Sequence, residues 1–144
     1  MTPRTYRCQV EVRGYELDSF GHVNHAVYIS YLEHARWKIF EEEGITLARL
    51  REWGRFPVIA AIEARYKAPT FLGDRLDILT TVLEHGKTSF VIGHEIRKST
   101  TDRPDQPVLD AKITVVMVNE QGRPSSLPEH VEVLWRESSA PRKT

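Results

Sequence analysis

The sequence predicts an α+β protein in which one long amphipathic helix packs on an antiparallel sheet. Apolar residues recur at helical spacing over one long segment, residues 24–43, whereas the flanking segments alternate apolar and polar residues with the period of a strand. The later strands are joined by short connections, and links of hairpin length favour antiparallel pairing. An amphipathic helix and alternating strands bury their apolar faces against each other, so the helix should cover one face of the sheet.

The first part of the chain predicts a strand, a loop and the long helix. Apolar residues alternate from Tyr6 to Val12, and a glycine-bearing loop follows over residues 14–23. Asn24 is the expected N-cap, because its side chain can accept hydrogen bonds from the first free backbone N–H groups, and Gly44 fits the position that ends a helix. The expected buried face of this helix consists of Tyr28, Leu32, Ala35 and Ile39.

The rest of the chain predicts four more strands and a short helix. A tight turn is expected at residues 86–87 and a longer, proline-bearing loop over residues 99–107. Ser126 and Glu129 have the spacing of a capping box, which predicts a short helix near the C-terminus. The four strands are expected over residues 58–66, 76–82, 90–96 and 109–117.

Length and composition indicate one globular domain over residues 1–137, followed by a disordered tail over residues 138–144. Of 144 residues, 20 are basic and 20 acidic, a balance that is atypical of nucleic-acid-binding proteins. Cys8 is the only cysteine, which excludes a disulfide within the chain and a cysteine-based metal cluster. Neither a signal peptide nor an apolar run of membrane-spanning length is present, so we expect a cytoplasmic protein without a membrane partner.

The segment just before the long helix carries the chemistry. Asp18 lies in the glycine-bearing loop, a few residues ahead of the helix start. A helix N-terminus presents unpaired N–H groups and a partial positive charge, which together can stabilise a developing oxyanion. A nearby carboxylate can attack a carbonyl carbon or activate water. This combination favours acyl-group hydrolysis, although an aspartate in a loop can also simply brace the backbone.

This segment resembles the 4-hydroxybenzoyl-CoA thioesterase branch of the hotdog superfamily. That branch has an aspartate, a glycine three residues later, and a tyrosine-rich helix that ends in Glu-x-Ala-Arg. The run Arg-Gly-Tyr-x-Leu-Asp, followed by His-Val-Asn and Ala-Arg-Trp, is most similar to bacterial long-chain acyl-CoA thioesterases, and the resemblance extends over residues 6–119. The matching residues are Asp18, Gly21, Tyr28, Tyr31, Glu33-His34-Ala35-Arg36, Tyr66-Lys67-Ala68-Pro69 and Gly73-Asp74.

The resemblance implies a fold, an activity and an assembly. The fold is the hotdog fold, an antiparallel five-stranded sheet wrapped around the long helix. The activity is hydrolysis of an acyl-CoA to a free acid and CoA, with Asp18 as nucleophile or general base and the backbone N–H of His25 as oxyanion donor. No metal or organic cofactor is needed. Two chains pair edge to edge, with the site at their interface, and the homodimers pair into a homotetramer.

The resemblance also implies two groups of substrate-binding residues. One group surrounds the helix start, where Asn24 is a cap first and Tyr28 either packs in the core or lines the acyl tunnel. The other group lies at the later strand turn, where basic residues of the resembling proteins meet the phosphates of CoA; an ordinary solvated hairpin explains it equally well. The two groups are Gly21, Val23, Asn24 and Tyr28, and Lys87, Thr88 and Ser89.

Several alternatives stay open at this point. The acyl group is a long aliphatic chain, an aromatic group of the hydroxybenzoyl or dihydroxynaphthoyl type, or an acyl group on a carrier protein. A non-catalytic acyl-binding hotdog module would keep the fold, and a hydratase would need an Asp-His pair that is missing. Glu33 is a second candidate base, but it can instead pair with Arg36 three residues on. His22 and His25 lack the further ligands that a metal site requires.

Overall fold

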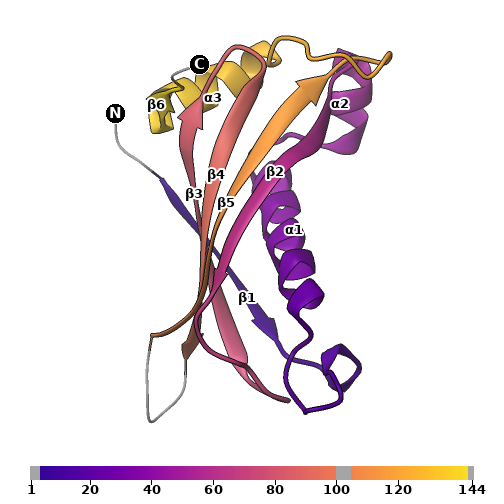
Figure 1. The fold of residues 1–144 in the computed structure, drawn as a ribbon. Helices are drawn as coiled ribbons and strands as arrows, with labels where there is room; N and C mark the ends of the chain where they lie inside the picture. Colours follow the sequence, from indigo (N-terminus) through magenta and orange to yellow (C-terminus); the bar gives the residue numbers. More distant parts are fainter. Residues whose placement is uncertain (1–3, 100–104, 143–144) are drawn as a thin grey trace.

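In the computed structural model, which describes residues 4–99 and 105–142, a curved antiparallel sheet wraps around a central helix (Figure 1). The strands are β1 (Thr5–Glu11), β2 (Phe56–Tyr66), β3 (Arg75–His85), β4 (Ser89–Ser99), β5 (Gln106–Val118) and the two-residue β6 (Ala140–Pro141). The helices are α1 (His25–Glu42), α2 (Leu47–Trp53) and α3 (Glu129–Ser138), with a 3₁₀ turn, η1, at Gly14–Glu16. The sheet has the order β1-β3-β4-β5-β2, and β6 joins β3 in parallel. The predicted α+β class and antiparallel sheet are confirmed, and two shorter helices accompany the long one.

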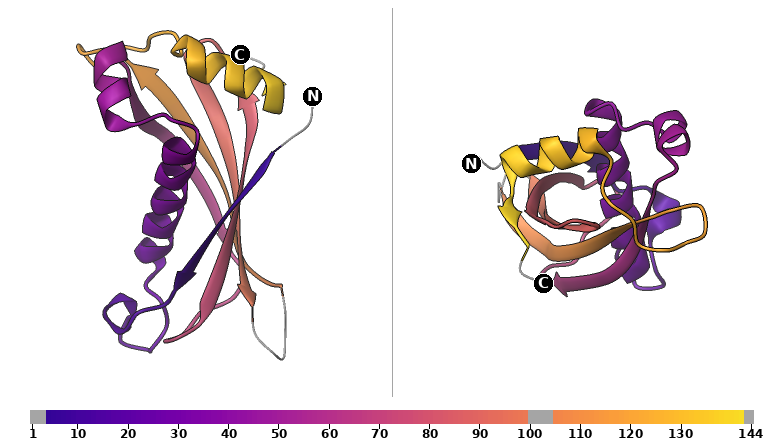
Figure 2. Two further views of the ribbon diagram at one scale, coloured as in Figure 1. Left: turned by 180° about the vertical axis from the view of Figure 1, so that it is seen from behind. Right: turned by 90° about the horizontal axis from the view of Figure 1, so that it is seen from above.

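Helix α1 forms where the sequence predicts it. The Asn24 side chain accepts a hydrogen bond from the Ala26 N–H at 2.9 Å, which confirms the N-cap. Gly44 adopts a φ of 75° just beyond the helix, a left-handed conformation that glycine reaches at little cost. The predicted face, Tyr28, Leu32, Ala35 and Ile39, is buried, and Figure 2 shows α1 lying alongside the curved sheet.

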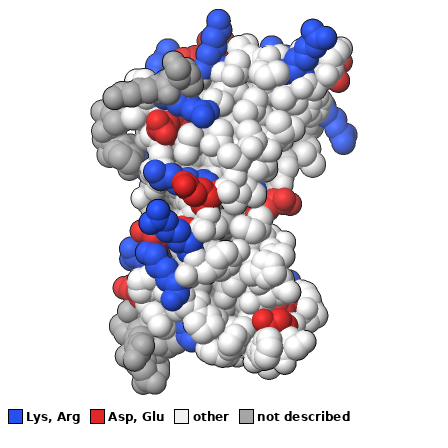
Figure 3. Space-filling model, viewed as in Figure 1, with Lys and Arg blue, Asp and Glu red and all other residues white. Residues whose placement is uncertain are grey.

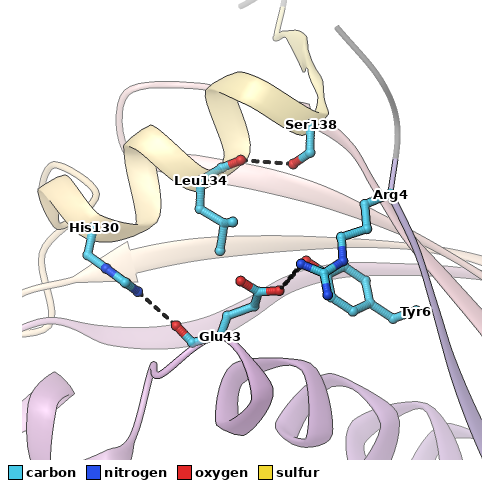
Figure 4. A network of polar contacts seen from close by, with 6 residues as sticks. All are labelled: Arg4, Tyr6, Glu43, His130, Leu134 and Ser138. Atoms are coloured by element: carbon cyan, nitrogen blue, oxygen red, sulfur yellow. Dashed lines mark hydrogen bonds and ion pairs between the residues drawn. The ribbon is translucent and has the colours of Figure 1, made fainter.

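The C-terminal end of α1 is anchored by a polar network. Three consecutive glutamates end the helix, where its dipole disfavours negative charge. Glu43 offsets this by turning its side chain to other elements, because its Oε1 accepts from the Arg4 guanidinium at 2.6 Å and from the Tyr6 hydroxyl at 3.0 Å (Figure 4). Its backbone carbonyl also lies 2.8 Å from Nε2 of His130 on α3. These contacts tie the end of α1 to β1 and α3.

Strands β1, β3, β4 and β5 bury the faces that their alternation predicts. His94 of β4 belongs to such a face, and its ring nitrogens lie 2.9 Å from Thr80 Oγ1 and 3.5 Å from the Arg36 guanidinium. Burial, together with the Arg36 charge, lowers the pKa of His94 to about 3, so the ring is neutral at physiological pH. Glu33 and Arg36 do not form the ion pair that was one option for Glu33, because Arg36 turns into the core and contacts this neutral ring.

Strand β2 departs from the prediction of a buried face. It lies at one edge of the sheet and is apolar but open to solvent, with Ile59 43% and Ile62 45% exposed. The opposite edge strand, β1, exposes the charged side chains of Arg7 and Glu11, which discourage pairing with a further strand. In β2 the exposed apolar residues lie in the first half, residues 58–62, whereas Glu63 and Arg65 expose charges in the second half. An exposed apolar stretch at a sheet edge is typical of a strand that pairs with another chain.

The predicted short helix near the C-terminus is present as α3, but its predicted cap is wrong, and one further helix was missed. Helix α2 was not predicted, because its seven residues give too short an apolar pattern; the Thr46 side chain caps it by accepting from the Arg49 N–H at 3.1 Å. Helix α3 begins after Pro128, so Ser126 does not cap it. The fixed φ of proline already suits a helix start, and the capping box therefore does not form.

The C-terminal segment differs from the predicted disordered tail. Ser138 ends α3, and β6 pairs with the end of β3. Arg142 then donates its N–H to the His85 carbonyl at 2.7 Å and its guanidinium to Ser89 Oγ at 2.6 Å, which fastens the segment to the β3–β4 hairpin. Residues 143–144 of the tail and 100–104 of the predicted long loop lie outside the described residues.

The surface mixes charges of both signs. Figure 3 shows Lys and Arg side chains interspersed with Asp and Glu along one side of the view, in keeping with the balanced composition. Among the described helices, none is both long and apolar enough to cross a membrane.

Candidate active site

The segment between β1 and α1 forms a closed loop at the lower end of the molecule in Figure 1. Its ends are joined by a hydrogen bond from the Asn24 N–H to the Glu16 carbonyl at 3.0 Å and by a bridge between Leu17 and Val23. The Val23 N–H also donates to the Thr70 carbonyl at 3.0 Å, which ties the loop to the connection between β2 and β3. The loop thus holds Asp18 between segments that are fixed to the helix start.

Asp18 shapes this loop as well as supplying its charge. Its Oδ1 accepts hydrogen bonds from the N–H groups of Phe20 at 2.8 Å and His22 at 3.1 Å. Gly21 adopts a φ of 82° within the turn, a conformation that other residues rarely reach. Among the described residues, Oδ2 has no hydrogen-bond partner. One carboxylate oxygen therefore braces the turn, and the other is free to act on a ligand.

The first turn of α1 leaves one backbone donor free beside this loop. The Asn24 side chain takes the Ala26 N–H, and the Asn24 carbonyl takes the Val27 N–H at 2.9 Å. The His25 N–H has no partner within the described part of the chain, whereas its carbonyl accepts from the Tyr66 hydroxyl at 2.8 Å. A free donor at the positive end of a helix can stabilise an oxyanion, and the exposed His25 side chain is not needed for this.

Polar side chains pack in pairs behind the loop. The Tyr28 hydroxyl lies 2.7 Å from Thr70 Oγ1, and the Tyr31 hydroxyl donates to Glu16 Oε1 at 2.8 Å. All four side chains are buried. Burial raises the pKa of both tyrosines, so their phenols keep their protons at neutral pH. Tyr28 is accordingly a packing residue within the single chain, with its hydroxyl already occupied.

Three residues organise this region in ways that were not predicted from the sequence. Thr70 forms hydrogen bonds with the loop and with Tyr28, and Tyr66 donates one to the first residue of α1. Glu16 accepts hydrogen bonds from Tyr31 and Asn24. These contacts mostly join segments far apart along the chain, which no local pattern reveals. Tyr66 had one signal, because it opens the Tyr-Lys-Ala-Pro run of the resemblance.

A family model described as the thioesterase-like superfamily matches residues 12–133. The chain belongs to this superfamily. The Escherichia coli long-chain acyl-CoA thioesterase FadM is 32% identical over 115 residues, which cover 77% of this chain and 81% of that protein. The Arabidopsis thaliana acyl-acyl carrier protein thioesterase ATL2 is 32% identical over 88% of this chain, which spans only 65% of the plant protein. The crystal structure of a hypothetical protein from Aquifex aeolicus is 26% identical, covers 90% of this chain and 98% of its own, and superposes with a TM-score of 0.81.

In this superfamily member, the two groups of predicted binding residues lie at opposite ends of the sheet. Gly21, Val23, Asn24 and Tyr28 gather at the helix start, whereas the hairpin over residues 86–88 lies at the upper end of Figure 1. The 11 residues of β3 separate the two ends, and a strand rises about 3.3 Å per residue, so the separation is on the order of 36 Å. A single chain does not bring the two groups together.

The upper hairpin of this thioesterase-like chain is partly occupied by its own C-terminal segments. Ser89 is buried, and its hydroxyl accepts from Arg142. The Lys87 carbonyl accepts from the Leu127 N–H at 2.9 Å, but the Lys87 side chain is exposed. Of the three predicted residues, Lys87 is therefore the one whose side chain is most open to a ligand, while Thr88 is half-buried.

The remaining candidate residues stand apart from one another. His22 packs edge-on against Phe71, with ring centroids 5.1 Å apart, and the His25 side chain is exposed. Within residues 4–99 and 105–142, no group of three or more His, Cys, Asp or Glu residues is placed to hold a metal ion. Glu33 is exposed on α1, outside the closed loop.

Proposed function

We propose that this chain is an acyl-CoA thioesterase that hydrolyses long-chain acyl-CoA to a free acid and CoA. The observation that carries the proposal is the free His25 N–H at the start of α1, beside a loop that presents the free oxygen of Asp18. The N–H and the helix dipole stabilise the oxyanion that forms when the thioester carbonyl is attacked. The chain supplies both the carboxylate and the oxyanion donor, so the route needs no metal or organic cofactor.

Asp18 acts in one of two ways. As a nucleophile, its Oδ2 bonds to the thioester carbon, the C–S bond breaks and CoA leaves as a thiolate, which gives a mixed anhydride that water then hydrolyses. As a general base, it takes a proton from water, that water attacks the same carbon, and the C–S bond breaks as CoA leaves as a thiolate. A single turnover in ¹⁸O-water separates the routes, because only the anhydride route can place label in the Asp18 carboxylate.

The deciding experiment compares wild type with Asp18→Asn in an assay of CoA release. Asparagine keeps an oxygen that accepts from Phe20 and His22, so the loop keeps its shape while the charge is lost. We expect kcat to fall by about 10²–10⁴-fold, the usual contribution of an acid–base group. Glu33→Gln is the matched control, since it removes an exposed carboxylate from α1 and should leave the rate unchanged. An active Asp18→Asn enzyme, or an inactive Glu33→Gln enzyme, would contradict the assignment.

The acyl group is the second part of the proposal. FadM, which is named a long-chain acyl-CoA thioesterase, covers most of this chain at 32% identity. Acyl-CoA substrates from acetyl to oleoyl, together with benzoyl derivatives, should give a rate that rises with chain length. Preference for a benzoyl substrate would replace the long-chain assignment with an aromatic one. ATL2 is named for acyl-acyl carrier protein, so an acyl carrier protein thioester belongs in the same series.

The active assembly in this proposal is a homodimer joined through β2, and two such dimers form the tetramer. The support is the exposed apolar stretch of β2, which includes Val58, Ile59 and Ile62 and lies at the edge of the sheet. Antiparallel pairing of two β2 strands sets the upper end of one chain beside the lower end of the other. A groove of about 820 Å³ lies at that upper end, next to the start of β2, and is lined by residues that include Trp53, Arg55 and His130. This pairing would enlarge the site beyond what one chain provides.

A further inference from the structure

Glu16 is a buried carboxylate that the proposed chemistry does not use. It lies two residues before Asp18, and only 9% of it is exposed. Removing a carboxylate from water is costly unless hydrogen bonds replace its hydration. Its contacts therefore indicate what holds the loop in place.

Three contacts converge on Glu16. Its Oε1 accepts from the Tyr31 hydroxyl at 2.8 Å and from the Arg13 N–H at 2.8 Å, and its backbone carbonyl accepts from the Asn24 N–H at 3.0 Å. Arg13 precedes the turn η1, Asn24 is the N-cap of α1, and Tyr31 lies in the second turn of that helix. One residue thus joins the beginning of the loop, its end and the body of α1.

Tyr31 is a rigid anchor for this contact. Its ring packs edge-on against Tyr28, with centroids 6.0 Å apart, and it belongs to the buried face of α1. Burial and then the hydrogen bond to Glu16 raise the pKa of Tyr31, so the phenol remains a donor. A hydrogen bond from a neutral donor to a carboxylate is shorter and stronger than one between neutral groups.

We propose that Glu16 and Tyr31 are positioning residues that fix Asp18 relative to the oxyanion donor at the start of α1. This inference rests on the proposed function and extends it. Asp18 is two residues from Glu16, and Tyr31 lies on the same helix as the His25 N–H. The hydrogen bond between Glu16 and Tyr31, here called the tether, therefore sets the position of the Asp18 carboxylate relative to that donor. Reacting groups displaced by about 1 Å can lose on the order of 100-fold in rate, which is why a tether of this kind matters.

The test uses Tyr31→Phe, Glu16→Gln and the double variant. Tyr31→Phe removes one oxygen and keeps the ring, so the core stays filled. We expect kcat/KM to fall about 10–100-fold in each single variant. Glu16→Gln keeps an acceptor oxygen but removes the charge, so it weakens the contact that Tyr31→Phe abolishes. The double variant should therefore be little worse than Tyr31→Phe alone. Phe40→Leu is a control for a general loosening of α1, since it alters a buried residue of the same helix at the far end from the loop; it should lower the melting temperature and spare kcat/KM.

The separate effects on kcat and KM distinguish positioning from a purely structural role. A displaced Asp18 carboxylate slows the reaction of bound substrate, so kcat should fall in Tyr31→Phe while KM changes little. A wild-type kcat in Tyr31→Phe, or a raised KM with an unchanged kcat and additive effects, would overturn the inference. If Glu16→Gln does not fold, the kcat and KM of Tyr31→Phe decide alone.

Failure of this inference is distinguishable from failure of the proposed function. If Asp18→Asn abolishes turnover and Tyr31→Phe has the wild-type kcat and KM, the thioesterase proposal stands and the proposed positioning roles of Glu16 and Tyr31 are wrong. If Asp18→Asn retains full activity, both fall, because there is then no carboxylate to position.

Discussion

The lower and upper ends of the sheet are held together by different kinds of contact. At the lower end, buried hydroxyl and carboxylate groups meet in pairs, Tyr31 with Glu16 and Tyr28 with Thr70. At the upper end, aromatic rings are fully buried, with those of Phe90 and Trp135 5.7 Å apart, and the polar contacts of Glu43 and Arg142 are exposed or only partly buried. Hydrogen bonds are directional and lose strength quickly when misaligned, whereas apolar packing tolerates small shifts. The directional contacts thus surround the loop whose geometry matters most to the proposed reaction.

The two ends also differ in what they offer a substrate. The lower end has the carboxylate and the helix start, and the upper end has the exposed Lys87 and the groove beside Arg55. The length of β3 keeps them apart in one chain. If both ends bind parts of one acyl-CoA, they must come from different copies.

The largest effect is expected from a change that separates two copies. Ile62→Lys places a charge in the exposed apolar edge of β2, where antiparallel pairing would bury it. We expect the protein to sediment as a monomer, and kcat/KM to fall by about 100-fold as positioning of the substrate is lost. Gln9→Lys, at the opposite edge strand, should change neither quantity. A monomeric Ile62→Lys protein with full activity would show that one chain is sufficient.

An intermediate effect is expected at the lower end from Thr70→Val. This substitution keeps the shape of the side chain but leaves the buried Tyr28 hydroxyl without a partner. An unsatisfied buried polar group costs about 1–3 kcal/mol, which a denaturant titration can measure as a loss in the free energy of unfolding. Adding Tyr28→Phe should restore much of that loss, because the orphaned hydroxyl is then gone. Equal and additive losses in the two single variants would argue against this pairing.

The smallest effect is expected at the upper end from Lys87→Ala. An exposed lysine that meets a CoA phosphate contributes about 1 kcal/mol, so KM for acyl-CoA should rise severalfold with kcat nearly unchanged. A truncated thioester that lacks the nucleotide phosphates should show no difference between variant and wild type. Identical KM values for acyl-CoA in Lys87→Ala and wild type would show that Lys87 is an ordinary solvated hairpin residue.

How far the sequence alone leads differs between elements. The N-cap at Asn24, the buried face of α1 and the alternating strands β1, β3, β4 and β5 are local patterns, and each was predicted correctly. The exposure of β2 was not predictable, because alternation shows that a strand has apolar faces but not whether this chain covers them. Helix α2 was too short to leave a pattern.

The candidate site also combines features that the sequence predicts with features that only the folded chain reveals. The loop, Asp18 and the helix start were predicted together because they are contiguous in the sequence. Glu16, Thr70 and Tyr66 act through contacts that only the folded chain creates, and their roles emerge from the structure. Lys87 and Ser89 were predicted as a second binding group, in a site shared by two chains, and the structure shows that β3 separates them from the helix start within one chain.

The double role of Asp18 limits how this loop can change in evolution or in the laboratory. Because one of its oxygens holds two backbone N–H groups, most replacements would reshape the turn at the same time as they removed the charge. Asparagine is the exception, because its side-chain oxygen can still accept from both N–H groups while the charge is removed. If the proposed role of Asp18 holds, a chain with asparagine at this position would bind the thioester without turning it over efficiently, and would serve as a trap for crystallising the complex.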